Sequence, residues 1–252
     1  MIFDAHFHII DPRFPLVEND GYLPPIFNIG DYRIASSPYS ITGGAIVSGS
    51  FQAFDQKYLL HALKKLGPSF VGVTQIPVSS SDEEIITLNR AGVRAVRFNL
   101  KRGGSAGIED LEALALRVHR LVNWHVELYV DSRDLGGVFE RLAKLPKVVI
   151  DHFGLSKQGL PLLLKLVEKG VYVKATGFGR IDFDPAEVIK NICDINENAL
   201  IFGTDFPSTR APRPFEAEDL EIFQRTLSER QVHKVLFQNA VNLYCPADYL
   251  TF

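Results

Sequence analysis

The sequence predicts a single α/β domain with the (β/α)8, or TIM-barrel, architecture. The chain has 252 residues, close to the roughly 250 that one such barrel takes. Eight short runs rich in Val, Ile and Phe alternate with longer amphipathic stretches, which is the order that produces a parallel sheet with right-handed crossovers. Eight strands in this length favour a closed barrel over an open doubly wound sheet. We therefore expect one domain over residues 1–252.

The predicted strands are short and apolar, several of them at nearly every position. Runs of this kind are typical of strands that are buried on both faces in a parallel sheet. In chain order, the predicted strands are Ile2–His8, Gly44–Ser50, Phe70–Gln75, Val93–Asn99, Val126–Asp131, Val148–His152, Val171–Thr176 and Leu200–Thr204.

Helical patterns lie between most of these strands. The serine run Ser79–Ser81 offers N-caps for one helix, and Pro185 follows Asp184 as a first helical residue behind its cap. No Gly-x-Gly-x-x-Gly opens a helix, so dinucleotide binding has no motif support. The predicted helices are Tyr58–Leu66, Asp82–Ala91, Ile108–Val122, Leu135–Leu145, Leu160–Lys169, Pro185–Ile195, Glu216–Leu227 and Glu229–Leu243.

The first connection, Ile9–Thr42, differs from the others. It shows little helical periodicity and contains Pro12, Pro15, Pro24, Pro25 and Pro38. A connection this long is usually functional or disordered. In a barrel it would lie over the C-terminal face, where active sites are built, so we hypothesise that residues 9–42 form a lid.

Composition and charge exclude several classes of partner. The net charge is −3, so we expect no nucleic-acid partner, which would need clustered Lys and Arg. No run approaches the roughly 18 apolar residues of a membrane span, and the start at Met1–Asp4 lacks the features of a signal peptide. Cys193 and Cys245 have neither metal-motif spacing nor disulfide density, which predicts reduced thiols in a cytoplasmic protein without a membrane partner.

Four titratable side chains fall at the carboxyl ends of three predicted strands. His6 and His8 end the first strand, and residues two apart on a strand point to the same face, so both imidazoles should face the barrel mouth while Phe7 packs outward. His152 ends the sixth strand and Asp205 follows the eighth. In a barrel these ends converge on one site. The alternative, that each histidine only satisfies a local hydrogen bond, would place three of them at the same end by chance.

These residues resemble the amidohydrolase superfamily, whose members open with His-x-His at the end of the first strand and place an Asp at the end of the eighth. Asp4–His8 and Gly203–Pro207 are similar to those two signatures. Within the superfamily, the chain is most similar to the lactone hydrolases that include 2-pyrone-4,6-dicarboxylate lactonase and several sugar lactonases. The segments that carry this similarity are Asp151–Gly154, Val96–Asn99 and Gly21–Pro25.

The resemblance implies a pocket that binds a carboxylated substrate. It assigns carboxylate binding to Arg97, Arg102 and Arg180, and polar contacts to Ser48, Ser50, Tyr22 and Tyr129. Arginine forms paired hydrogen bonds with carboxylates, which suits a planar diacid, and Ser48 and Ser50 would share one face of the second strand. Tyr129 also fits ordinary filling of the barrel.

Two of these arginines have other interpretations. Arg102 lies in a loop beside Lys101 and could be a solvated surface charge. Arg180 could pair instead with Asp182 or Asp184.

His6, His8 and Asp205 could hold one divalent ion, zinc or manganese, with water at an open position. The fourth strand lacks the Lys with which many superfamily members complete a two-metal site, because Lys101 falls beyond its end. The resemblance to the pyrone-dicarboxylate lactonase implies hydrolysis without a metal or other cofactor. The residues leave both alternatives open.

The leading hypothesis is hydrolysis of a small carboxylated lactone. Asp205 would act as general base toward water, while His6, His8 and His152, or an ion that they hold, would stabilise the oxyanion. A second hypothesis is a mononuclear-metal hydrolase or decarboxylase that acts on another small acid or sugar lactone. A third is a barrel that binds a small acid without catalysis, because one fold hosts many functions.

Overall fold

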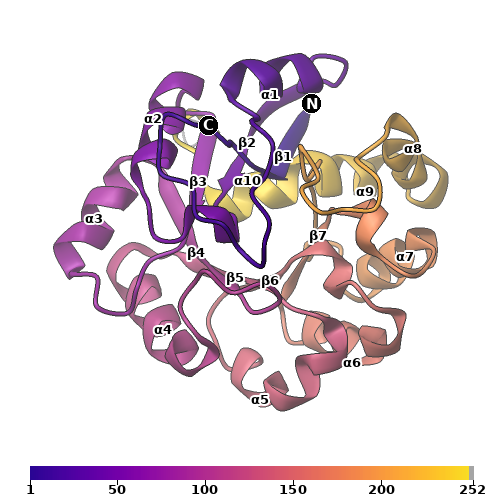
Figure 1. Cartoon of the computed structure of the whole chain (residues 1–252). Coiled ribbons are helices and arrows are strands. Elements are labelled where there is room, and N and C mark those ends of the chain that lie inside the picture. Colours follow the sequence, from indigo (N-terminus) through magenta and orange to yellow (C-terminus); the bar gives the residue numbers. More distant parts are fainter. Residues whose placement is uncertain (250–252) are drawn as a thin grey trace.

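Each predicted apolar run forms a strand, and the eight strands pair in sequence order with parallel neighbours (Figure 1). The computed structural model describes residues 1–249. Between the first and last strands the barrel closes at its C-terminal edge, where His8 N–H donates to Phe206 O at 2.7 Å and Asp205 N–H donates to His6 O at 2.7 Å. The strands are β1 (Ile2–Phe7), β2 (Ile41–Val47), β3 (Phe70–Thr74), β4 (Val93–Asn99), β5 (His125–Tyr129), β6 (Val148–Ile150), β7 (Tyr172–Ala175) and β8 (Leu200–Phe202).

Most of the helices form a ring around the strands, whereas α10 lies across one end of the barrel (Figure 1). Among the described residues, no helix combines the length and apolar character needed to cross a membrane. Their bounds are α1 (Ile29–Ser36), α2 (Lys57–Leu66), α3 (Asp82–Arg90), α4 (Leu111–Val122), α5 (Phe139–Leu142), α6 (Leu160–Glu168), α7 (Pro185–Ile195), α8 (Ala217–Thr226), α9 (Glu229–His233) and α10 (Asn239–Tyr244).

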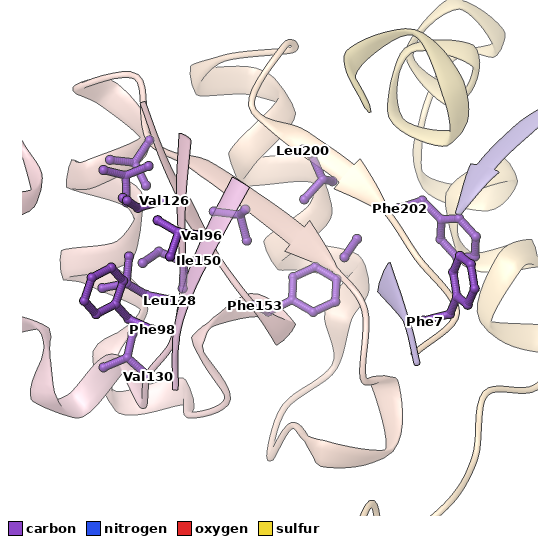
Figure 2. Packing of buried hydrophobic residues seen from close by; sticks show 14 of the residues in the cluster. Phe7, Val96, Phe98, Val126, Leu128, Val130, Ile150, Phe153, Leu200 and Phe202 are labelled. Carbon is purple, nitrogen blue, oxygen red and sulfur yellow. The ribbon is translucent and has the colours of Figure 1, made fainter. Parts of the chain in front are cut away.

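The main apolar core lies between the barrel wall and the helices. On β4 and β5, Val96, Phe98, Val126 and Leu128 face this layer and are fully buried (Figure 2). The residues between them, such as Arg97, therefore point into the barrel, because successive side chains on a strand alternate between its faces. This alternation places Arg97 and Asn99 of β4 and Glu127 of β5 in the interior of the barrel.

A smaller apolar cluster fills the other end of the barrel. Ala5, Ala45 and Val73 contribute from the strands, and the C-terminal helix contributes Leu243 and Tyr244. The Tyr244 ring stacks on Phe3, with 5.7 Å between the ring centroids. The C-terminal segment thus covers the N-terminal end of the barrel, and the opposite end remains for a site.

The first connection departs from the sequence prediction because it contains a helix. Asn28 and Asp31 form a reciprocal capping box that begins α1, in which the Asn28 side chain accepts from the backbone of Asp31 and Asp31 accepts from that of Asn28. Tyr32 of this helix stacks on Phe7, with 3.8 Å between the ring centroids. The expectation of little helical structure over 9–42 was therefore wrong, because caps and one buried aromatic outweigh the weak periodicity.

Other element boundaries also differ from the predictions. The strands predicted to run to Ser50, His152 and Thr204 end three, two and two residues earlier, because the chain turns away from the sheet before the polar residues. The predicted helix Leu135–Leu145 is a 3-10 helix over Ser132–Gly137 followed by the short α5. Gly136 and Gly137 explain this break, since glycine is unfavourable inside a helix.

Candidate active site

The C-terminal mouth of the barrel brings together the four predicted catalytic residues. His6 lies on β1 and His8 follows it directly, whereas His152 follows β6 and Asp205 follows β8. The Oδ1 atom of Asp205 lies 3.8 Å from Nε2 of His6 and 3.8 Å from Nε2 of His8. The centroids of the His6 and His152 rings are 4.8 Å apart. All four side chains are buried.

Hydrogen bonds to the outer nitrogens orient the histidine rings. His8 Nδ1 donates to the carbonyl oxygen of Val47 at 2.7 Å, so its Nε2 carries a lone pair toward Asp205. His152 Nδ1 lies 2.7 Å from the Thr176 hydroxyl. The Nε2 of His6 and the Oδ1 of Asp205 have no hydrogen-bond partner among the described residues. These two atoms and His8 Nε2 therefore surround a point at which a water molecule or an ion would fit.

Gly177 allows the His152 ring to sit where it does. Gly177 has a φ of 61°, and a Cβ there would lie 2.6 Å from His152 Nδ1. Glycine adopts this left-handed conformation without steric cost, whereas any side chain would displace the imidazole. Position 177 thus requires glycine for both reasons.

The three imidazoles are neutral near neutral pH. Burial lowers the pKa of His8 to about 3, with a further contribution from the Arg97 charge. Burial also holds the pKa values of His6 and His152 well below their usual range, and nearby cations, including Lys174 for His6, lower them further. Neutral imidazoles can act as hydrogen-bond donors, acceptors or metal ligands.

Asp205 keeps one oxygen paired and one oxygen unpaired. Arg180 Nε donates to Asp205 Oδ2 at 2.7 Å, and Arg180 Nη2 donates to the Thr209 carbonyl at 2.8 Å. Burial raises the pKa of Asp205, and the Arg180 charge offsets only part of that rise. In its ionised form Asp205 is therefore a stronger base than an exposed aspartate. The alternative pairing of Arg180 with Asp182 or Asp184 was wrong.

Arg97 is held by a second buried carboxylate. Its Nε donates to Asp151 Oδ2 at 2.9 Å and its Nη1 donates to the carbonyl of Ser48 at 3.0 Å. Its Cζ lies 5.2 Å from the centroid of the Tyr129 ring. Burial alone would raise the pKa of Asp151, but the charges of Arg97 and Lys174 outweigh it and hold that pKa below its usual value.

A buried lysine below the histidines was given no role by the sequence analysis. Lys174 on β7 donates to Glu127 Oε2, and its Nζ lies 3.3 Å from His6 Nδ1 and 3.5 Å from Asp151 Oδ1. Glu127 also accepts from Tyr244 at 2.5 Å. The sequence does contain a signal for Lys174, which is a charged residue within an otherwise apolar strand. Such a residue needs a buried partner, because lysine is almost never fully buried without one.

A cavity opens above these groups, and most of the predicted binding residues reach it. Ser48 is an exception, because its hydroxyl lies 2.6 Å from the Tyr58 hydroxyl and its side chain does not line this cavity within residues 1–249. Ser50 lines the cavity from a 3-10 helix after β2, so the two serines do not share one strand face as expected. The lining residues are His8, Tyr22, Gly49, Ser50, Phe51, Arg97, Asn99, Arg102, Tyr129, His152, Arg180, Thr209 and Arg210.

Two neighbouring contacts explain why Arg102 faces this cavity. Lys101 binds Asp131, with Nζ 3.1 Å from Oδ2, so it turns away. The backbone N–H of Arg102 donates to Asn99 Oδ1 at 3.0 Å and its carbonyl accepts from Asn19 at 2.9 Å. Arg102 is half-buried in the wall of the cavity rather than free in solvent.

The residues at the mouth also fit one divalent ion. His6, His8 and Asp205 offer ligand atoms within 4.8 Å of one another, as do His6, Asp151 and His152. The first set includes two atoms without a hydrogen-bond partner, and the carbonyl bond of His8 Nδ1 is the usual outer contact of a metal-binding histidine. His6 Nε2 can bind a metal only if Nδ1 carries the proton toward Asp151, 3.4 Å away.

The chain matches the sequence model of the amidohydrolase family over residues 3–245. Over 156 residues it is 30% identical to a 2-pyrone-4,6-dicarboxylate hydrolase from Comamonas testosteroni, a match covering 60% of this chain and 51% of that protein. This match thus spans about half the length of that relative. Over 267 residues the chain is 25% identical to a D-galactarolactone isomerase from Agrobacterium fabrum, covering 96% of this chain and 90% of that protein.

A solved structure shares the architecture. The crystal structure of a Pseudomonas putida protein, provisionally named 2-pyrone-4,6-dicarboxylic acid hydrolase, superposes with a TM-score of 0.78. The two sequences are 26% identical, and the match covers 97% of each chain.

Proposed function

We propose that this chain, which belongs to the amidohydrolase family, opens the ring of a small lactone that carries carboxylate groups. The observation that carries the proposal is the position of Asp205 between two neutral histidines at the foot of a cavity lined by arginines. A base and hydrogen-bond donors suit hydrolysis of an ester, and guanidinium groups suit an anionic substrate. The similarity to a pyrone-dicarboxylate hydrolase supports the same substrate class.

In the proposed reaction, a water molecule lies between Asp205 Oδ1 and the Nε2 atoms of His6 and His8. The lone pair on His8 Nε2 orients the water, and Asp205 accepts its proton as the oxygen attacks the lactone carbonyl. N–H groups of His6 and His152 donate to the developing oxyanion. The ring oxygen then leaves and receives the proton from Asp205, so water adds across the ester bond to give an open hydroxy or enol acid.

Lysine 174 supports this arrangement through His6. An ammonium group can only donate, so a hydrogen bond from Lys174 Nζ to His6 Nδ1 places the imidazole proton on Nε2, where the oxyanion would develop. Asp151, which is paired with Arg97, neutralises part of the local positive charge. We propose that Lys174 is a positioning residue for the His6 tautomer.

The cavity arginines would bind the substrate carboxylates. Arg97, Arg102 and Arg180 converge on the cavity, and Tyr22, Ser50 and Tyr129 add polar groups around it. Ser48 would contribute only through its carbonyl, which fixes Arg97. The proposed partner is thus a small carboxylated lactone.

The alternative route would use one zinc or manganese ion held by His6, His8 and Asp205. Such an ion would supply a Lewis acid and a bound water with a lowered pKa. The arginines would bind the same substrate carboxylates in that case. The two routes differ in the position of the proton on His6. It lies on Nε2 in the metal-free route, and it would lie on Nδ1, facing Asp151, if Nε2 held an ion.

A second candidate is a lactone of a sugar diacid. The match to the galactarolactone isomerase, which extends over 96% of the chain, favours it. Such a substrate also carries a carboxylate beside a lactone ring, so the arginine cavity suits it as well. Isomerisation would move the ring ester without net addition of water.

The test is turnover of 2-pyrone-4,6-dicarboxylate, sugar-diacid lactones and unsubstituted 2-pyrone, with and without chelator, on protein whose metal content is measured. We expect the diacid lactones to open and the unsubstituted pyrone to react poorly. Nuclear magnetic resonance of the products separates hydrolysis from isomerisation. Turnover that survives complete metal removal supports the metal-free route, and recovery only with added ion supports the other. If none of the lactones reacts in either condition, the proposal is wrong.

A further inference from the structure

Four arginines line the cavity, but only two of them carry uncompensated charge. Asp151 pairs with Arg97 at 2.9 Å and Asp205 pairs with Arg180 at 2.7 Å, so each of these guanidinium groups is already neutralised. Within residues 1–249, the ion pairs include neither Arg102 nor Arg210, and the cavity lining contains no Asp or Glu. The lining therefore carries two guanidinium charges, those of Arg102 and Arg210, that no carboxylate of the cavity wall balances.

Arg210 takes its position from the first connection of the barrel. Its Cζ lies 4.4 Å from the centroid of the Tyr22 ring, and its Nη2 donates to the carbonyl oxygen of Asn19. Both contacts are with uncharged groups, so they orient the guanidinium without neutralising it. An arginine has five N–H donors, and the contact with Asn19 uses one of its two terminal nitrogens.

The two segments that carry these contacts are themselves fixed. Asn19 and Tyr22 exchange backbone hydrogen bonds of 3.0 and 3.1 Å across Asp20 and Gly21, whose φ angles of 49° and 68° match a type I′ turn. Asn19 Nδ2 donates to the carbonyl of Arg102 at 2.9 Å, so one asparagine joins the segments of both uncompensated arginines.

Arg180 also fixes the segment after β8, which contains Arg210. Its Nη2 donates to the carbonyl of Thr209, the residue before Arg210, at 2.8 Å. The base Asp205 and Arg210 are thus connected through Arg180. Carboxylate binding at Arg210 would therefore occur at a fixed position relative to the reacting centre.

We propose that Arg210 is a substrate-binding residue that, together with Arg102, binds the carboxylates of a dianionic substrate and so selects diacids over monoacids. This inference rests on the proposed function and extends it, because two uncompensated guanidinium groups match two carboxylates. Arg97 and Arg180 supply hydrogen bonds and positioning, while Arg102 and Arg210 supply the balancing charge. The contacts of Arg210 with Asn19 and Tyr22 also make the first connection part of the binding site.

The test compares binding of isophthalate, a planar diacid that cannot be hydrolysed, with binding of benzoate, by isothermal titration calorimetry. Arg210→Gln preserves a planar group that can donate to Asn19 and stack on Tyr22, but it removes the charge. We expect isophthalate affinity to fall roughly 10- to 100-fold, as for loss of a charged hydrogen bond, and benzoate affinity to fall much less. Arg210→Lys should restore part of the preference for the diacid.

Arg225→Gln, the same substitution on an exposed face of α8, is the matched control and should leave both affinities unchanged. Equal losses for isophthalate and benzoate in Arg210→Gln, unchanged isophthalate binding, or no isophthalate binding by the wild-type protein would each overturn the inference. The proposed reaction is judged separately. If no lactone turns over but isophthalate binding depends on Arg210, the inferred carboxylate site is supported and the proposed reaction is not. If a diacid lactone turns over with the same KM in Arg210→Gln, the reaction stands and the inference fails.

Discussion

Replacing Lys174 with methionine should destabilise the protein far more than replacing an exposed lysine. Methionine is unbranched like lysine and only one atom shorter, and it removes the charge inside the barrel. Lys174 is fully buried and lies against Glu127, which is also fully buried. The substitution would leave Glu127 without its only cationic partner of fixed charge within residues 1–249.

The expected loss in the free energy of unfolding depends on the hydrogen bonds and ion pairs that Glu127 and Asp151 keep. Breaking a buried ion pair by removing one partner costs about 3–5 kcal/mol. Glu127 still accepts from Tyr244 at 2.5 Å and from His125 at 3.1 Å, and Asp151 keeps Arg97. These remaining hydrogen bonds place the loss near the lower limit, at about 3 kcal/mol.

A double-mutant cycle measures this coupling. The free energy of unfolding is obtained from urea denaturation of the wild-type protein, Lys174→Met, Glu127→Gln and the double variant. The loss of unfolding free energy in the double variant should be smaller than the sum of the two single losses by at least about 1 kcal/mol. The reason is that the Glu127 charge, which Lys174→Met alone leaves unpaired, is absent from the double variant. Lys190→Met, at an exposed position on α7, should change stability by no more than about 0.5 kcal/mol. A loss below about 1 kcal/mol in Lys174→Met, or additive losses, would refute the reasoning.

Three further predictions concern the base, a buried carboxylate and the first connection. Asp205→Asn should lower kcat about 10²- to 10⁴-fold with little change in KM. It should also remove the acidic limb of the wild-type pH–rate profile, in which activity falls as the pH drops through the raised pKa of Asp205. Near wild-type turnover of this variant would contradict the role of Asp205 as the base. Burial raises the pKa of Asp4 to about 6 from 3.8, so its protonated form contributes stability below pH 3.8 that is lost as the pH rises through about 6. The size of this contribution is about 3 kcal/mol, and Asp4→Asn should remove that pH dependence from the unfolding free energy; an unchanged slope between pH 4 and 6 would be inconsistent with the shift. If residues 9–42 act as a lid, isophthalate should slow proteolytic cleavage in this segment, whereas an unchanged cleavage rate would argue against it.

The architecture and the grouping of four titratable side chains at one end of the barrel were accessible from the sequence. Eight apolar runs separated by amphipathic stretches predict a parallel barrel, because strands buried on both faces are mostly apolar whereas the helices that cover them have one exposed face. His6, His8, His152 and Asp205 were identifiable because polar residues at the carboxyl ends of such strands must converge on one mouth. This reasoning depends only on local spacing and on the known geometry of the fold.

The partners of these residues were decided by the tertiary structure. Asp151 follows β6 and pairs with Arg97 of β4, and Arg180 pairs with Asp205 rather than with its own neighbours Asp182 and Asp184. Ion pairs between strands distant in sequence depend on register and on the inward or outward direction of each side chain. A single sequence does not encode these distances locally.

The same limit applies to the outer part of the site. Ser48 turned away from the cavity because β2 ends at Val47, and a boundary shift of a few residues redirects a side chain completely. Arg210 reached the cavity because the first connection and the segment after β8 meet through Asn19 and Tyr22. The sequence therefore determined the barrel and the grouping of His6, His8, His152 and Asp205 at its mouth, because these follow from periodicity along the chain. The distribution of charge around the cavity was decided only by the packing of distant segments, because it depends on which arginine meets which carboxylate.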